Sequence, residues 1–345
     1  MKIKDIPIQN IYYMLLYTWD SVQYIGTEKI NKVEGNNLYE LLASVLIKDI
    51  SKLVKKGIYK EYKFNYEETP SLKGKINFDD SLKRSSFIKG RACCYFDEFT
   101  EDIIYNKILK ATLYNILKST NISNIIKYDA MKVYKYFSNV TTSKLTKKDF
   151  YFIDTHKNNV HYKLSLDICR LIYENMMIDE SSGKVTFKDF CKDEKKMVYV
   201  FERFVRNFYK THLKGCSVTR ENIRWDAAGD EIDLLPIMQT DITIKNKNTI
   251  VIMDTKFYRN TLATNMNREK IYSSNLYQIF SYLKNAEAKG GAYLNSIGIL
   301  LYPQVDRILD NIYDIQGHKI KVCSINLNTD WKEIHKRLID ICNCI

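Results

Sequence analysis

Proline and glycine are scarce in this sequence. The 345 residues include only 4 Pro and 12 Gly, whereas hydrophobic residues make up 45%. This composition excludes collagen-like and low-complexity disordered chains, both of which are rich in these two residues. It is typical of a folded, helix-rich protein, and the length predicts two domains.

Long apolar runs are absent as well. No stretch approaches the ~18 consecutive apolar residues that a transmembrane helix needs. The first ten residues, MKIKDIPIQN, lack the apolar segment and the small-residue cleavage site of a secretory signal. We therefore expect a cytoplasmic protein with no membrane partner.

Two common functional motifs are missing. The sequence contains no GxxxxGK[ST], so the chain by itself is not a P-loop motor. Its eight cysteines include no CxxC pair, which argues against a zinc ribbon and against a thioredoxin-type redox site. We expect reduced, mostly buried thiols.

Positive charge is in excess. The 53 Lys and Arg exceed the 41 Asp and Glu, and the net charge of +12 is spread over both halves of the chain. Such a chain is attracted to phosphate polymers through counterion release. A composition rich in Lys, Ile, Asn and Tyr also follows from an AT-rich genome, so charge alone favours a nucleic-acid partner only slightly.

Hydrophobic periodicity divides the chain into two parts. Residues 1–180 predict a helix-rich α+β domain, and the polar stretch 181–195 predicts a junction between domains. Helices are expected in this first domain at 8–19, 37–56, 101–119, 123–137 and 158–177, and strands at 58–66, 73–78 and 87–96.

Residues 196–345 predict an α/β domain with one mixed central sheet flanked by helices. The expected helices cover 197–215 and 273–287, and a last helix begins at Asp330. The expected strands cover 217–224, 231–236, 241–244, 249–257, 296–303 and 319–327.

The chemistry concentrates in residues 240–259, which read TDITIKNKNTIVIMDTKFYR. KNKN is a credible hairpin turn between two strands, so Asp241 and Asp254 can meet across the pair. Asp254 and Lys256 lie two apart and therefore share one face of the strand. The apolar run IVIM before Asp254 is typical of a strand buried on both faces, where a carboxylate is unexpected.

This pattern predicts a phosphodiester-cleaving metal site. Mg²⁺ binds through one or two carboxylates, with waters and substrate phosphate as further ligands. We assign Asp241 and Asp254 to the metal and Lys256 to the attacking water and the developing charge. The alternative is that three charges at strand ends are simply solvated.

Two helices supply candidate supporting groups. Glu202 lies at the edge of the apolar stripe of helix 197–215, where it could add a carboxylate or form an ordinary salt bridge. Gln278 and Tyr282 lie four apart and share one helix face. An amide can contact a metal-bound water or phosphate, and tyrosine can contact DNA or pack in the core.

Together, Glu202, Asp241, Asp254, Lys256 and the Gln278-xxx-Tyr282 pair resemble the PD-(D/E)xK nuclease superfamily, in its branch with a Q-xxx-Y helix. The resemblance implies a restriction-endonuclease-like fold and Mg²⁺ as cofactor, with Mn²⁺ as a possible substitute. One departure is that Thr240 stands where proline is usual.

A narrower resemblance covers nearly the whole chain. The sequence is similar to the McrC family, the nuclease subunit of McrBC-type restriction systems that act on modified DNA. The segments that carry the similarity are IPIQNIYYMLLYTWD (6–20), LKGKINF (72–78), FDEFTEDIIYNKILKATL (96–113), LLPIMQTDI (234–242), MDTKFY (253–258) and NLYQIFSYL (275–283).

The McrC resemblance implies a division of labour. An AAA+ GTPase hexamer of the McrB type recognises DNA with modified cytosine. The N-terminal region of the McrC-like chain docks on this hexamer and stimulates its GTP hydrolysis, and the C-terminal domain cuts double-stranded DNA. Two other hypotheses stay open: a non-catalytic adaptor that regulates an AAA+ motor, and a stand-alone PD-(D/E)xK nuclease.

Overall fold

The computed structural model describes residues 6–25, 37–151, 153, 159–178, 184–258, 263–265, 268–305 and 307–343. The chain forms two compact units, which are discontinuous in sequence. One comprises Met1–Val33 with Asp189–Ile345 and is called the sheet unit here. The other, Glu34–Lys188, is called the helical unit.

This division differs from the predicted one at the N-terminus. The boundary at Lys188 lies within the predicted junction 181–195, but the first helix belongs to the sheet unit and not to a domain 1–180. Helix α1 (Ile8–Thr18) packs on α8 (Glu194–His212), and Tyr13 makes edge contacts with the ring of Phe204. The buried aromatic partners of α1 lie almost 200 residues away, so local periodicity could not reveal them.

The helical unit is built on four helices. Their apolar side chains are buried where α2 (Leu38–Lys56) packs against α5 (Asn124–Tyr134) and α7 (Lys163–Asn175), and where α4 (Ile104–Lys118) packs against α5 and α7. A short antiparallel pair, β4 (Met176–Ile178) and β5 (Val185–Phe187), lies close to α4. Further short helices of this unit are η4 (Phe87–Lys89), η5 (Lys135–Phe137), α6 (Lys147–Tyr151) and η6 (Val160–Tyr162).

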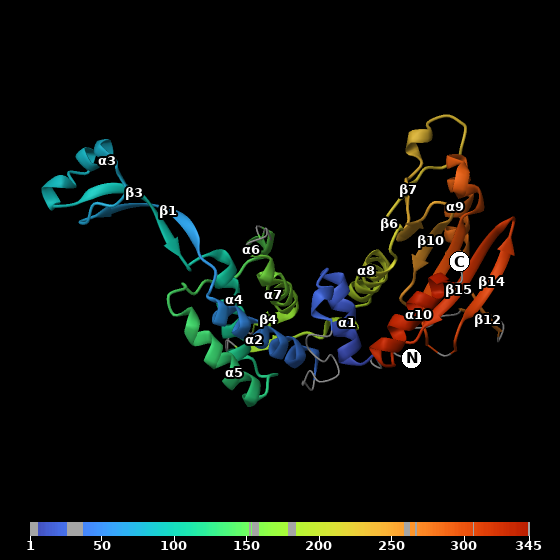
Figure 1. Cartoon of the computed structure of the whole chain (residues 1–345), viewed down its shortest axis with the longest axis horizontal. Helices are drawn as coiled ribbons and strands as arrows, with labels where there is room; N and C mark the ends of the chain where they lie inside the picture. The colour runs from blue at the N-terminus through green and yellow to red at the C-terminus, as the bar shows by residue number, and fades with distance from the viewer. Residues whose placement is uncertain are drawn as a thin grey trace. The chain divides into compact units, whose positions relative to one another are not determined.

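A three-stranded ribbon extends from this helical unit, as Figure 1 shows, and is called the arm here. It consists of β1 (Glu61–Thr69), β2 (Lys75–Ile76) and β3 (Ala92–Thr100) in the order β1-β3-β2, with α3 (Phe78–Lys83) at its tip. Gly74 has φ +59°, and a Cβ there would lie 2.2 Å from the carbonyl oxygen of Tyr95. Only glycine therefore fits at this position, where the backbone just before β2 lies close to β3.

The sheet unit contains the mixed central sheet predicted from the sequence. Its six strands follow the order β14-β15-β13-β10-β9-β6. The strands β10 (Ile250–Thr255), β13 (Ile297–Pro303) and β15 (His318–Ile325) are parallel neighbours, whereas β6 (Ser217–Thr219), β9 (Ile242–Lys245) and β14 (Asp310–Ile315) pair antiparallel. Two short pairs lie beside it: β7 (Asn222–Ile223) with β8 (Met238–Gln239), and β11 (Ala263–Asn265) with β12 (Arg268–Lys270).

Helix α9 (Ser273–Ala286) covers one face of this sheet. It packs on β10 and β13, and its Ile279 joins a core that includes Ile250 and Ile252. A Cβ on Gly298 of β13 would lie 2.9 Å from Leu283 and 3.0 Å from Ile279, so glycine permits the close approach of α9. Further helices of this unit are α10 (Trp331–Asn343), which contacts β15, and the short η2 (Val22–Tyr24), η7 (Phe190–Lys192), η9 (Glu287–Lys289) and η10 (Gly291–Asn295).

Two sequence predictions for the sheet unit were wrong. Residues 231–236 form no strand, because η8 (Ile232–Leu234) occupies them and exposes Leu234. The edge strand β14 was not predicted. In the part of the chain that the structure describes, no helix has the length and apolar character needed to cross a membrane.

Candidate functional site

The predicted hairpin is confirmed. Strand β9 pairs antiparallel with β10, and the last pair, Met253 with Ile242, leaves Asp254 and Asp241 as the next residues on the two chains. The intervening turn is fixed by Asn246, whose Oδ1 accepts hydrogen bonds from the backbone N–H groups of Asn248 at 2.9 Å and Thr249 at 2.7 Å.

Asp254 is fully buried in the central strand β10. It lies two residues after Ile252 and therefore shares the sheet face that α9 covers. Its Oδ2 lies 2.8 Å from Lys256 Nζ, while its buried Oδ1 accepts no hydrogen bond from a described residue. Burial, followed by the charge of Asp241, raises the pKa of Asp254 to about 7 despite Lys256. The Lys256 ammonium thus offsets only part of the free-energy cost of burying this carboxylate, because the net shift of its pKa is still upward.

Asp241 lies at the same end of the hairpin. Its Oδ2 accepts hydrogen bonds from the backbone N–H of Thr255 at 2.8 Å and from the Thr255 hydroxyl at 3.0 Å. Burial raises the pKa of Asp241, and the charge of Glu202 acts in the same direction, whereas the Thr255 bond lowers it. The charge of Asp241 in turn raises the pKa of Asp254, as expected for two carboxylates that share one site.

Lys256 links the hairpin to α9. Its Nζ donates to Gln278 Oε1 at 2.8 Å in addition to the Asp254 ion pair. Gln278 Nε2 in turn lies 2.7 Å from Tyr282 Oη, which donates to the carbonyl of Gln239 at 3.0 Å. Burial alone lowers the pKa of Lys256, but Asp254 and Asp241 outweigh it, so the net shift is upward and the ammonium stays charged.

Glu202 also lies at this site, but an arginine pairs with it. Arg206 Nη1 lies 2.7 Å from Glu202 Oε1 and donates to the backbone carbonyl of Asp241 at 3.2 Å. Arg220 Nε approaches the same Glu202 oxygen at 3.7 Å. The salt bridge that the sequence allowed as one possibility for Glu202 is therefore present. The charge of Glu202 still raises the pKa values of Asp241 and Asp254.

Sequence reasoning overlooked two residues at the site, Thr255 and Arg206. Thr255 lies between Asp254 and Lys256, both of which were predicted site residues. It holds Asp241 through both its backbone N–H and its hydroxyl. Arg206 follows Glu202 by four residues on α8, a spacing that indicates a salt bridge on a helix. That spacing was the available signal for Arg206.

Thr240, which stands where proline is usual, is buried and hydrogen bonded. Its hydroxyl accepts from the backbone N–H of Glu221 at 3.0 Å and lies 2.9 Å from the hydroxyl of Thr243. Its own N–H donates to the carbonyl of Glu221 at 3.0 Å. Proline has no N–H and could not form this last bond. Threonine therefore anchors the chain just before Asp241.

These residues fit a hard cation that needs few protein ligands. Among the described residues, no three His, Cys, Asp or Glu side chains converge as a metal cluster. Asp241 and Asp254 form a pair, and Asp254 retains a buried oxygen without a donor. Mg²⁺ commonly binds through one or two carboxylates and keeps several waters, so this pair suits it better than it suits Zn²⁺.

The raised pKa of Asp254 predicts a pH-dependent stability. The folded carboxyl has a pKa of about 7, whereas the ordinary pKa of an aspartate is 3.8, so between these values the folded state binds the extra proton. The free energy of unfolding therefore falls as the pH rises from ~4 to ~7. In EDTA, we expect Asp254→Asn to raise the thermal midpoint at pH 8 by a few degrees and to leave it unchanged near pH 4.

The three tryptophans, Trp19, Trp225 and Trp331, all belong to the sheet unit, so their fluorescence reports its unfolding. Asp314→Asn, on the exposed edge strand β14, is the matched control and should show no such pH-dependent gain. An Asp254→Asn variant less stable than the wild type at pH 8 would contradict the buried-charge account.

Comparison with known proteins identifies the family of the chain. Residues 8–303 match the family model of the McrBC 5-methylcytosine restriction system component. The chain is 34% identical over 339 residues to the type IV methyl-directed restriction enzyme EcoKMcrBC of Escherichia coli K12, with 97% of each sequence covered.

A solved structure shares the fold. It is a refined half-complex from the tetradecameric assembly of Thermococcus gammatolerans McrB AAA+ hexamers with bound McrC. The similarity has a TM-score of 0.61, covers 98% of this chain and 76% of the other, and comes with 16% sequence identity. The family match and the identity to the E. coli enzyme establish that this chain belongs to the McrBC restriction family, as its McrC-like segments predicted.

Proposed function

We propose that this protein is the Mg²⁺-dependent endonuclease subunit of a McrBC-type restriction system, and that its sheet unit has the PD-(D/E)xK fold. It would cut double-stranded DNA carrying modified cytosine together with an AAA+ GTPase hexamer of the McrB type. The observation that carries the proposal is the fully buried Asp254, which lies beside Asp241 and Lys256 and retains an unpaired oxygen.

Asp241 and Asp254 would hold Mg²⁺ at the end of the hairpin. The bound cation would lower the pKa of a water and neutralise charge on the scissile phosphate. Thr255 occupies one oxygen of Asp241 and so restricts how that carboxylate turns. Because the pKa of Asp254 is about 7, the carboxylate becomes available as the pH rises through neutrality.

Lys256 would act on the phosphate and on the water. Gln278 orients the Lys256 ammonium by accepting a hydrogen bond from it. Tyr282, one turn further along α9, contacts Gln278. A fixed ammonium beside two carboxylates can donate to a non-bridging phosphate oxygen where negative charge develops. Gln278 and Tyr282 are therefore assigned to positioning Lys256.

The arm offers the surface for the AAA+ partner. Tyr62, Phe64 and Tyr66 alternate along β1, so they share one face, and the antiparallel register places Tyr95 and Phe99 of β3 on that face. The rings of Tyr62 and Phe99 lie 4.9 Å apart, and those of Tyr66 and Tyr95 lie 4.7 Å apart. Tyr62 and Phe64 remain 74% and 65% exposed. A continuous exposed aromatic stripe is typical of a protein-binding surface.

Reconstitution tests this function. We expect a plasmid with methylated cytosine to be cut only when the chain, its AAA+ partner, GTP and Mg²⁺ are all present. EDTA should abolish cleavage because the two carboxylates alone cannot activate water, and Mn²⁺ should restore part of it. Gel analysis of methylated and unmethylated plasmid measures the outcome.

The same assay separates the alternatives. Cleavage by the chain without partner or GTP would indicate a stand-alone nuclease. Stimulated GTP hydrolysis without cleavage, under every metal and DNA condition, would indicate a non-catalytic adaptor. The Oδ1 atom of Asp254 argues against the adaptor, since a buried carboxylate oxygen without a hydrogen bond lowers stability when nothing binds it.

A further inference from the structure

The helical unit carries a second exposed surface, on α5 and the turn η5 (Lys135–Phe137) that follows it. The buried residues Ala130, Val133 and Phe137 fix the inner face, since α5 packs against α2 and α4. On the outer face, Ile125, Tyr128 and Tyr136 are 76%, 66% and 59% exposed. We call the outer face, with the exposed Met131, Lys132 and Lys135, the α5 face.

Aromatic and cationic groups form one unit on this face. Lys132 Nζ lies 4.1 Å from the centre of the Tyr128 ring, a cation–π contact that holds the ammonium at the surface. Lys132 also pairs with Asp129 at 2.9 Å, on a helix edge where both groups are about half exposed. An exposed pair of this kind contributes little and can exchange for another anion.

The surrounding sequence is strongly basic. Between residues 118 and 148 there are seven lysines and one acidic residue, Asp129. The lysines are Lys118, Lys127, Lys132, Lys135, Lys144, Lys147 and Lys148. Such an excess would repel a basic partner and attract a polyanion.

We infer that the α5 face binds the sugar–phosphate backbone of duplex DNA. Lysines at helical spacing neutralise phosphates, tyrosine hydroxyls donate to phosphate oxygens, and Ile125 offers an apolar contact to the sugar. Contacts of these kinds to phosphates and sugars carry no sequence information directly, so the binding is independent of sequence. This inference rests on the proposed function and extends it, because it adds a DNA contact in the helical unit, whereas Asp254 belongs to the sheet unit.

Salt-dependent binding tests the inference. The full-length chain is titrated onto a fluorescent ~30-bp duplex in EDTA, and anisotropy is followed from low to physiological salt. For Lys132→Gln/Lys135→Gln we expect about tenfold weaker binding at low salt and a salt slope smaller by ~2, since each phosphate contact contributes ~0.9. Tyr128→Ala/Tyr136→Ala should weaken binding while leaving the slope nearly unchanged.

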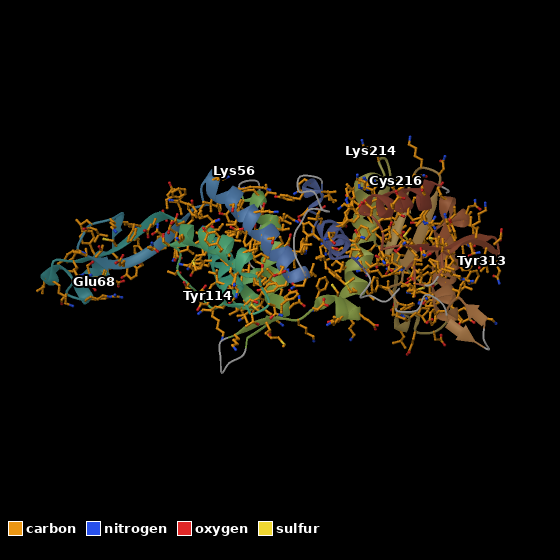
Figure 2. All side chains as sticks on the ribbon, turned by 90° about the horizontal axis from the view of Figure 1, so that it is seen from below. Lys56, Glu68, Tyr114, Lys214, Cys216 and Tyr313 are labelled. Carbon is orange, nitrogen blue, oxygen red and sulfur yellow. The ribbon has the colours of Figure 1, made fainter. Side chains whose placement is uncertain are left out.

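Lys55→Gln/Lys56→Gln removes the same charge from the exposed end of α2 and serves as the control. Lys55 and Lys56 lie in the last turn of α2 and do not belong to the α5 face, and Figure 2 shows Lys56 on the opposite side of the helical unit from Tyr114. The control should retain the wild-type slope. Circular dichroism of each variant confirms that its helices are intact.

Three results would overturn the inference. The first is an equal loss of affinity in the control pair, which would mean a diffuse charge effect. The second is loss of AAA+ partner binding with unchanged DNA binding, which would make the face a protein surface. The third is binding to anionic vesicles without binding to DNA. Cleavage of methylated plasmid is measured separately, so a wrong α5 assignment and a wrong nuclease assignment give different patterns.

Discussion

Asp254→Asn is expected to lower the rate of DNA cleavage by ~10²- to 10³-fold, the range of losses seen when a group that stabilises developing charge is removed. The variant keeps the shape of the side chain but cannot supply a carboxylate to the cation. Because Asp254 is buried at the end of β10 and belongs to a different unit from the arm, we expect stimulation of GTP hydrolysis to be unchanged. Single-turnover cleavage of methylated plasmid and phosphate release measure the two activities.

Asp314→Asn is again the control, and it should cut at the wild-type rate. Lys256→Ala should behave like Asp254→Asn, because it removes the ammonium that both Asp254 and Gln278 hold. In EDTA-treated protein, Mg²⁺ should raise the thermal midpoint of the wild type but not that of Asp254→Asn. Wild-type cleavage by either variant would place the active site elsewhere.

The hairpin could be predicted because its signals are local. The apolar run before Asp254 requires a strand buried on both faces, and KNKN supplies the turn, so the meeting of Asp241 and Asp254 follows from register. Gln278 and Tyr282 could be paired because a helix places residues four apart on one face. The hydrogen bond from Lys256 to Gln278 depends on how α9 packs against β10, which spacing alone does not determine.

The errors arise where non-local packing decides the structure. Residues 231–236 alternate like a strand, but the only neighbouring strands described, β7 and β8, pair with each other, and Pro236 disfavours a ladder position. Strand β14 reads DNIYDI and escaped prediction because an edge strand exposes polar residues on both faces. Helix α1 has a clear apolar stripe, yet only its contacts with Phe204 and Trp331 show which unit it joins.

The site was incomplete for the same reason. Thr255 points its hydroxyl at Asp241 because Asp241 precedes β9 and reaches across the end of β10. Arg206 contacts the carbonyl of Asp241 only because α8 packs beside the segment that contains Asp241. Sequence spacing thus selects the charged groups that the structure brings together, while the groups that orient them require the packed structure.

Removing the aromatic stripe from the arm is expected to weaken partner assembly and GTPase stimulation, the two properties that Asp254→Asn leaves unchanged. Phe64→Ser/Phe99→Ser removes two exposed rings from one face of β1 and β3. If the stripe binds the AAA+ partner, these two rings are candidate hot spots, and truncating one can cost ~2 kcal/mol or more. We expect at least ~30-fold weaker assembly for a loss of that size and loss of GTPase stimulation, measured by analytical ultracentrifugation and phosphate release.

The arm variant should leave the metal site intact, because its residues and Asp254 belong to different units. Mg²⁺ should therefore still raise its thermal midpoint, whereas cleavage of methylated plasmid should fall because the partner is not recruited. Leu294→Ser, an exposed apolar residue of the sheet unit, controls for loss of surface hydrophobicity and should assemble normally. Normal assembly by the arm variant would exclude the stripe as the docking surface. Normal assembly without GTPase stimulation would instead assign the stripe to activation of an already bound partner, separating docking from stimulation on the same chain.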